Sequence, residues 1–320
     1  MRNAALAING TSIDHSKFTR EPGVYRAIDY TMIDPLPRML YHYTTAAGLH
    51  GIMSTPHPVG ERPFGVRNMW ASDVTFLNDS EEMQHGFRRI IDAAAASASG
   101  RPWLPDVVKP ALDGRVGKPR DRTYAISLSA NGDQLSQWRA YGKSGGFALG
   151  LPTSGRAESP AGSIALATKT EGVSFGKVIY DPTLQQRSAE ELIREFLEYF
   201  EPAMLSGDTA LQLSLTTQFA SNAVRLAAFM KHEAFSEEAE YRITKTTNAR
   251  DYKTRLSGGV DIPYIEIPII PNTGVLSDLT VVVGPRSSGD RDTATRSVRA
   301  LWHGYGVGVV HSKIPYRERA

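Results

Sequence analysis

The segment over residues 237–243 (EEAEYRI) carries the densest chemical signal in the chain. If it forms a strand, alternate side chains point to opposite faces, so Glu238, Glu240 and Arg242 share one face. Two carboxylates one strand period apart, next to a guanidinium, can position a hydroxyl group or stabilise a developing cation. The plainer interpretation is a solvated strand face with a neighbouring ion pair, and this segment taken alone favours it.

A second candidate is the predicted strand over residues 39–44 (MLYHYT), in which His42 and Thr44 share one face and Tyr43 lies on the other. A lone histidine in a strand is more often structural, with its ring bonded to a backbone group. The Thr44 hydroxyl gives this histidine a polar companion. The face that carries both is therefore a candidate ligand contact.

The stretch over residues 124–151 predicts two apolar strands joined by a long connection. Ser127 and Ser129 share one face of the first strand. The connection is much longer than the roughly two to five residues of a plain hairpin, and loops of that length are often functional. We therefore expect a loop over residues 134–141 to form the wall and cover of a binding site. Its candidate contacts are Gln137, Trp138, Arg139 and Tyr141, of which the two aromatic residues can stack on a ring, although most tryptophans fill cores.

Several common site types are excluded or unsupported. Cysteine is absent, which excludes disulfides, thiolate metal sites and cysteine nucleophiles. The GKS triplet at residues 142–144 lacks the earlier glycine of a phosphate loop, and GKSGG precedes a predicted strand where a nucleophile elbow needs a helix. The eight histidines show no metal-binding spacing. No metal site and no tightly bound cofactor are expected.

Composition places the chain among ordinary globular proteins. Its 320 residues are 41% hydrophobic and 22% charged, with a net charge of +2, which argues against a protein built mainly to coat nucleic acid. No stretch approaches the roughly 20 apolar residues of a membrane span, and no signal-peptide pattern follows Met1. We expect a cytoplasmic protein without a membrane partner.

The order of the predicted elements indicates one domain. Residues 1–37 are read as an N-terminal arm, and residues 38–317 as a single α/β domain. Helical spacing predicts a helix after Asp79, with Glu82 in a capping box, and a second helix that begins at Ser188. The other expectations are a loop over residues 100–122, a strand over 176–181, a helix over about 209–231, and a final strand, helix and strand over 279–314.

This order predicts an α+β fold: a mixed sheet with a two-helix insertion over about residues 185–232 and a C-terminal β-α-β unit. A strand–helix–strand unit of this kind implies a right-handed crossover between two parallel strands.

Five segments in the same succession resemble a bacterial family of domains of unknown function: LYHYT, FLND, SLSANGDQLSQWRAYG, EEAEYR and SKIPYR. More distantly, LYHYT before a short helix is similar to the opening strand of ADP-ribosyltransferases and the related RNA 2′-phosphotransferases. This resemblance implies their mixed sheet and NAD as a substrate. It also implies that His42 holds the nicotinamide ribose, that Ser127 or Ser129 lies on the second strand, and that Glu240 is the catalytic acid with Glu238 in an E-x-E pattern. The implied substrate contacts also include Tyr43, Thr44, Gln137, Trp138, Arg139 and Tyr141.

Three functions follow as hypotheses. The first is an ADP-ribosyltransferase or NAD glycohydrolase that acts as a toxin, an effector or a component of phage defence, with a protein or nucleic-acid acceptor and an antitoxin or defence-system partner. The second is a non-catalytic module that senses a nucleotide or a partner protein through Gln137, Trp138 and Arg139. The third is a magnesium-dependent nuclease that uses Asp79, Asp133 and the glutamates.

Overall fold

A computed structural model describes residues 36–53, 67–77, 80–114, 122–141, 145–153, 172–247, 252–270, 279–286, 288–302 and 307–315, together with a short hairpin near the N-terminus. In that hairpin β1 (Leu6–Ile8) pairs antiparallel with β2 (Thr11–Ile13). The predicted arm covers residues 1–37, and its residues before 36, apart from this hairpin, lie outside the described residues, as does Asp79.

The centre of the molecule is a ten-stranded mixed sheet. Its main path runs β12-β11-β6-β3-β5-β4-β10-β9, and β8 pairs with the other edge of β5 and then with β7. Only β11 and β12 run parallel; the other described pairs are antiparallel. The strands are β3 (Met39–Thr44), β4 (Arg67–Asp73), β5 (Arg122–Ser129), β6 (Phe147–Pro152), β7 (Val173–Lys177), β8 (Glu240–Thr247), β9 (Lys253–Ser257), β10 (Val260–Ile270), β11 (Thr280–Val283) and β12 (Gly308–His311).

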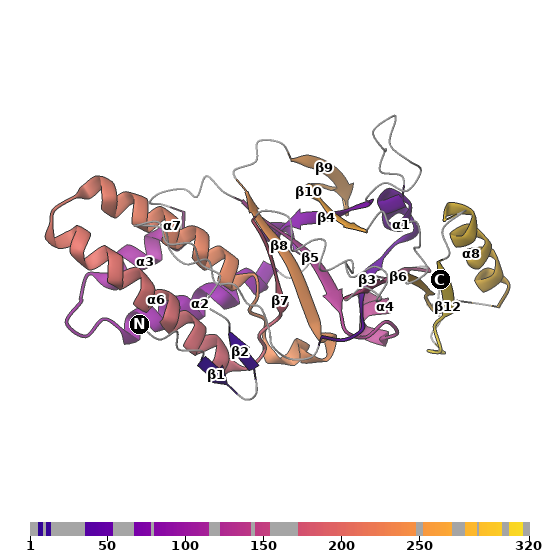
Figure 1. Ribbon diagram of the computed structural model, residues 1–320, viewed down its shortest axis with the longest axis horizontal. Helices are drawn as coiled ribbons and strands as arrows, with labels where there is room; N and C mark the ends of the chain where they lie inside the picture. Colours follow the sequence, from indigo (N-terminus) through magenta and orange to yellow (C-terminus); the bar gives the residue numbers. More distant parts are fainter. Residues whose placement is uncertain are drawn as a thin grey trace, which may run out of the picture.

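The sheet splits along one edge of β5. Near the end of β5, Ser129 pairs with Tyr41 of β3. Near its beginning, Tyr124 and Ala125 pair with Asp73 and Ser72 of β4. Neither strand pairs with residues 126–128 along that edge, so β3 and β4 lead into two separate branches. Figure 1 shows β4, β9 and β10 rising away from β3 and β6.

Helices cover one side of the sheet as a separate layer (Figure 1). Its core contains Phe196 and Phe219, whose rings lie 4.7 Å apart. In α6, the buried residues Leu192, Phe196 and Phe200 recur at helical spacing, which gives the helix the apolar face that this layer buries. The layer consists of α2 (Ser80–Ala96), α3 (Leu104–Leu112), α6 (Pro182–Leu205) and α7 (Thr209–Ala227).

The opposite face of the sheet forms a second core, in which both branches take part. Leu40 and Leu149 from the β3 branch pack in one cluster with Ile267 of β10 and Ile243 of β8. The helices α1 (Ala46–Met53) and α8 (Ser288–Leu301) contribute Leu49, Ile52 and Val298. No described helix is long and apolar enough to cross a membrane.

Much of the predicted element order is confirmed. The strand over residues 39–44, the following short helix, and the two long helices are present, and the C-terminal unit forms as β11, α8 and β12 with the predicted parallel pair. The chain is an α+β protein with a mixed sheet.

The predicted loop over residues 100–122 is wrong in its first half, where α3 forms. Pro105 lies in the first turn of α3, where its missing N–H costs nothing. Leu104, Val108 and Ala111 then recur at helical spacing and are buried in the helical layer. The proline and glycine content of the region concealed this apolar stripe.

The predicted loop over residues 134–141 is also mostly helical, because α4 (Leu135–Tyr141) forms there. Trp138 is only 2% exposed, and its ring meets Tyr43 edge-on at 4.7 Å. A segment that buries its tryptophan is part of the core, so it does not form the free cover that the length of the connection suggested.

Two element boundaries differ from prediction. Helix α6 begins at Pro182, because the Asp181 carboxylate caps it by accepting bonds from the Thr183 and Leu184 amides at 2.7 and 3.1 Å. Strand β7 correspondingly ends at Lys177, before the predicted 181. Strand β8 begins only at Glu240, after a 3-10 turn η2 (Glu233–Glu238) and Ala239 in a left-handed conformation (φ 43°).

Candidate functional site

His42, Ser127 and Glu240 come from three adjacent strands and are joined through Ser127. The His42 Nδ1 atom lies 3.0 Å from the Ser127 carbonyl oxygen, which faces the split edge of β5. The Ser127 hydroxyl donates to the Glu240 carboxylate on β8. Ser127 is partly exposed. In a strand, the side chain points out of the sheet, whereas the carbonyl points in the plane of the sheet toward a neighbouring strand. One serine can therefore contact both partners.

His42 and Glu240 nevertheless lie on opposite faces of the sheet. On β3, His42 shares its face with Leu40, which belongs to the core between the two branches. Glu240 pairs with Ser129 and faces the helical layer. The histidine therefore reaches Ser127 only at the split, where neither β3 nor β4 occupies the edge of β5.

Burial lowers the pKa of His42, and the nearby Arg255 guanidinium lowers it further, while the bond to the Ser127 carbonyl opposes both effects. The imidazole is therefore neutral at physiological pH. Its Nδ1 carries the proton, because a carbonyl oxygen can only accept a hydrogen bond. A neutral ring with a fixed tautomer can orient a ligand hydroxyl or carbonyl but adds no charge.

Glu240 is held by two cations between the sheet and the helices. Arg242 Nε lies 2.8 Å from Glu240 Oε1, and Arg242 Nη2 lies 2.9 Å from Oε2. Lys231 Nζ is 3.3 Å from Oε2. Burial alone would raise the pKa of Glu240, but the charges of Arg242 and Lys231 and the bonds from Arg242 and Ser127 outweigh burial and lower it to about 2. Glu240 is therefore a carboxylate at any physiological pH.

Two more carboxylates complete this network. Glu82 of α2 accepts a hydrogen bond from Arg242 Nη2 and lies 3.7 Å from Lys231. Glu238 binds Lys231 Nζ at 2.6 Å. Burial raises the pKa of Glu238, against the opposing effect of Lys231. Burial would lower the pKa of Lys231, but the surrounding carboxylates raise it. We call Glu82, Lys231, Glu238, Glu240 and Arg242 the buried charge network.

The buried charge network corrects the prediction of a solvated strand face. The face with Glu240 and Arg242 is not solvated, because these residues are only 5% and 1% exposed. The capping box predicted for Glu82 involves Asp79, which lies outside the described residues; the Glu82 carboxylate reaches Arg242 on β8. Sequence periodicity identified the shared strand face but could not show that a helical layer would cover it. Lys231, which supplies one of the two cations, was missed.

Ser129 and Thr44 have structural contacts. The Ser129 hydroxyl donates to the Glu238 carbonyl at 2.8 Å and accepts from the Asn131 amide at 3.0 Å, so it fixes the turn after β5. Thr44 Oγ1 faces Gly48 of α1 so closely that any side chain at position 48 would collide with it. Thr44 is partly exposed, whereas Ser129 is buried.

The residues of α4 do not join His42, Ser127 and Glu240. Gln137 is 7% exposed and Trp138 2%. Asp133 fixes this region, since its carboxylate accepts from Trp138 Nε1 at 2.8 Å, from the Ser312 hydroxyl at 2.6 Å and from the Lys313 amide at 2.8 Å. Arg139 is exposed and Tyr141 is partly exposed. Tyr43 packs with Trp138 on the β3 face opposite His42.

The β4 branch of the split carries polar residues that the sequence analysis did not identify. Arg255 of β9 donates from Nη2 to the Ser72 hydroxyl at 2.9 Å. Trp70 and Tyr264, with ring centroids 4.9 Å apart, lie on the same face. The sequence feature that could have indicated this branch is the Gly258-Gly259 pair, since two glycines favour a two-residue hairpin turn. In the structure both have positive φ and connect β9 to β10.

Comparison with known proteins gives one match. Residues 137–243, less than half of the chain, match the model of a family described as "Protein of unknown function (DUF2971)". This match covers most of the LSQWRAYG segment and the EEAEYR segment, and it is consistent with the resemblance to a domain of unknown function. Neither the curated proteins nor the solved structures include a significant match to the chain.

Proposed function

We propose that this protein is an ADP-ribosyltransferase-like enzyme that uses NAD as its substrate. One observation carries the proposal: His42, Ser127 and Glu240 lie on the adjacent strands β3, β5 and β8 and are joined through Ser127 at the split of the sheet. The sequence resemblance implies the same three strands as the carriers of the substrate site.

In the proposed reaction, the bond between the ribose C1′ and the nicotinamide nitrogen breaks. Both electrons of the bond leave with the nitrogen, so neutral nicotinamide departs and positive charge develops on the ribose, as in glycoside chemistry. An acceptor oxygen or nitrogen then attacks C1′ and gives up its proton. Water as the acceptor makes the enzyme an NAD glycohydrolase, and a protein or nucleic acid makes it a transferase.

In the proposed reaction, Ser127, His42 and Glu240 have different roles because they occupy different positions at the split. Ser127 is partly exposed and is the group that contacts the ribose, while the neutral His42 ring orients a ribose hydroxyl from the other side of the split. Glu240 acts through Ser127, whose hydroxyl it orients, and supplies the fixed negative charge that favours the developing cation. In this arrangement Glu240 is a positioning residue, and Glu238 is linked to it only through Lys231.

A second candidate function is a non-catalytic module that senses a nucleotide. It is favoured by the engagement of both Glu240 oxygens with Arg242 and Lys231, since a carboxylate held in this way can serve stability alone. A metal-dependent nuclease has no comparable support: among the described residues, no group of three histidine, aspartate or glutamate side chains is placed to hold a metal ion.

Nicotinamide release from NAD tests the proposal directly. We expect the parent protein to release nicotinamide, and Ser127→Ala and Glu240→Gln to reduce kcat by at least about a hundredfold, the usual loss when an electrostatic contribution to the transition state is removed. Glu82→Gln is the matched control, because it removes the same charge from the same Arg242 without touching Ser127.

The two functions predict different results. If parent and Glu240→Gln both fail to release nicotinamide and transfer no label from NAD to cell protein or nucleic acid, the enzymatic function is refuted. If Glu82→Gln and Glu240→Gln reduce kcat equally, Glu240 contributes to the stability of the fold and has no specific role in the reaction. Expression in bacteria tests the proposed toxin role, which predicts growth arrest that Glu240→Gln relieves and Glu82→Gln does not.

A further inference from the structure

Within the part of the chain that the structure describes, the β4–β10–β9 branch of the split sheet contains a cation, Arg255, without a carboxylate partner. We infer that Arg255, together with Ser72 and Trp70, binds the phosphate groups of a nucleotide ligand. This inference deepens the proposed function, because NAD carries a diphosphate, and it rests on that function for the identity of the ligand.

The residues are brought together by strand register. Arg255 pairs with Ile262 across the β9–β10 hairpin, which places its side chain on the face that also carries Tyr264. Tyr264 in turn pairs with Ser72 of β4, and Trp70 lies one strand period before Ser72. The result is a short row of polar and aromatic groups from three neighbouring strands.

The charge of Arg255 is not neutralised within the described part of the chain. Among the described residues, its side chain donates to the neutral Ser72 hydroxyl, and burial lowers the pKa of Arg255 against an opposing effect from Tyr264. The carboxylate on this face, Glu266, is already bound by Lys253 at 2.6 Å and by Asn68 at 3.3 Å. A partly buried cation without a counter-charge is costly, and an anionic ligand removes that cost.

Hydrogen bonding points to the same ligand chemistry. Arg255 Nε and Trp70 Nε1 are buried nitrogen atoms that have no hydrogen-bond partner among the described atoms. Both can only donate, so their missing partner is an acceptor. Buried donors are normally satisfied, and an arginine fork matches the geometry of phosphate oxygens.

The position of this cation relative to His42 suits a dinucleotide. Arg255 is close enough to lower the pKa of His42 on the other branch of the split. A ligand with ribose at His42 and Ser127 would therefore carry its phosphates toward Arg255. Arg139, a substrate contact expected from the sequence, lies on α4 instead.

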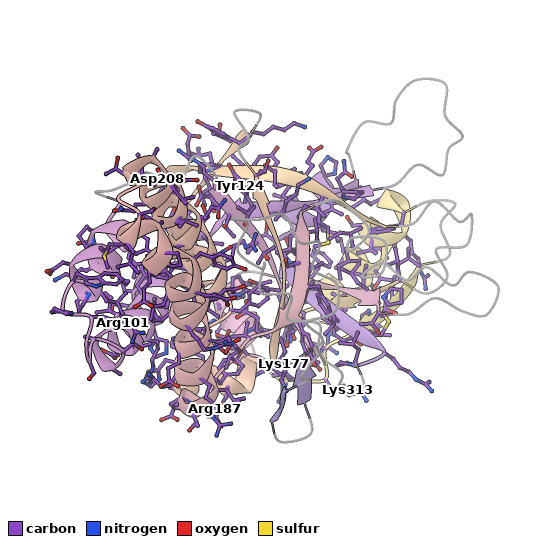
Figure 2. All side chains as sticks on the ribbon, turned by 60° about the vertical axis from the view of Figure 1, so that its left-hand side comes forward. Arg101, Tyr124, Lys177, Arg187, Asp208 and Lys313 are labelled. Atoms are coloured by element: carbon purple, nitrogen blue, oxygen red, sulfur yellow. The ribbon has the colours of Figure 1, made fainter. Side chains whose placement is uncertain are left out.

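Calorimetric titration of the full chain with ADP-ribose and with adenosine tests the inference. We expect the parent to bind ADP-ribose at least about tenfold more tightly than adenosine, because charged hydrogen bonds of this kind contribute that much or more. Arg255→Gln should remove the difference. Arg187→Gln is the matched control, because it removes the same charge from an exposed residue of α6 in the helical layer (Figure 2).

Further variants separate the site from a loss of folding. Arg255→Lys keeps the charge but loses the two-pronged geometry, so its ADP-ribose affinity should fall between those of the parent and Arg255→Gln. Trp70→Phe keeps a ring and loses Nε1, and it should weaken ADP-ribose while leaving adenosine unchanged. Inorganic pyrophosphate should compete with ADP-ribose. Thermal unfolding of each variant confirms that it is folded.

The inference is overturned if the parent binds ADP-ribose no better than adenosine, or if Arg255→Gln binds ADP-ribose as Arg187→Gln does. Failure of the enzymatic function has a different signature. In that case ADP-ribose binding depends on Arg255, yet no nicotinamide is released from NAD. Conversely, nicotinamide release with a KM for NAD that Arg255→Gln does not change refutes the Arg255 site and leaves the function intact.

Discussion

At the scale of single residues, Ser127 is the point where two chemically different environments meet. Its side chain faces the anionic Glu240 and the buried charge network, whereas its carbonyl faces the neutral His42 ring in the split. The register of the strand pairs places the side chains of Ser127 and Glu240 on one face of the sheet and that of His42 on the other. The contact between His42 and Ser127 depends on the missing strand partner along β5, which no local pattern encodes.

The depressed pKa of His42 predicts a pH dependence of stability. The folded state holds this imidazole neutral below its ordinary pKa of 6.5, so the unfolded state binds the proton more readily. The contribution of His42 to the free energy of unfolding is therefore fully present above about pH 6.5 and is lost as the pH falls below that value. Urea unfolding of the parent and His42→Asn between pH 5 and 8 should show a flatter stability profile below about pH 6.5 for the variant. Parallel profiles would contradict a ring that the folded state keeps neutral.

At the scale of elements, strands with strict alternation and the short helix α1 were predictable, whereas the short helices α3 and α4 were not. The alternating pattern predicts β3, β5 and β8, because one face of each strand packs into an apolar core. α3 contains Pro105 and Pro110, and α4 is rich in polar residues, so both resemble loops until their few apolar residues find a surface. The β9–β10 hairpin was missed because most of β9 is exposed and carries no apolar stripe.

The candidate site was predictable in part for the same reason. Residue type and strand period identify His42, Ser127 and Glu240. The roles of Lys231, Glu82 and Arg255 depend on contacts between elements that are distant in sequence, so no local pattern indicates them. Trp138 shows the converse: its residue type suggested ligand stacking, but packing against Tyr43 places it in a core.

Asp133 connects α4 with the C-terminal strand, which gives a prediction at this scale. Asp133→Ala removes the acceptor of Trp138, Ser312 and the Lys313 amide together. Trp138 and Ser312 are buried, and a buried donor left without a partner costs about 1–3 kcal/mol. Hydrogen exchange should accelerate in both α4 and β12. Ser312→Ala removes one of these bonds and should have a smaller effect. Acceleration confined to one of the two elements would show that Asp133 does not couple them.

At the scale of the whole molecule, the sheet and the helical layer have separate apolar cores, and the buried charge network lies between them. Arg242 of β8 binds Glu82 of α2 and also donates to the Ala228 carbonyl just after α7 at 2.5 Å. The two layers are therefore joined by charge-assisted hydrogen bonds in addition to apolar contact.

Removal of Arg242 should loosen this junction. Arg242→Met leaves Glu82 and Glu240 buried without their main cation, and breaking a buried ion pair from one side costs about 3–5 kcal/mol. Calorimetric melting should show a lower Tm and separate transitions for the helical layer and the sheet. Arg101→Met is the control, since its pair with Glu201 joins the connection between α2 and α3 to α6 within one layer and is partly exposed. A single, equally cooperative transition in both variants would refute the coupling role.

The left-handed Ala239 has a consequence for how Glu238 and Glu240 are held. Among the described residues it is the one non-glycine residue with a positive φ, a conformation that costs a side-chain-bearing residue about 1–2 kcal/mol. The backbone strain is offset where the Ala239 carbonyl accepts from the Ala130 amide at 3.0 Å. Part of the folding free energy is thus stored as local strain next to the carboxylates, and Glu238 takes its orientation from the turn before β8 rather than from the strand itself.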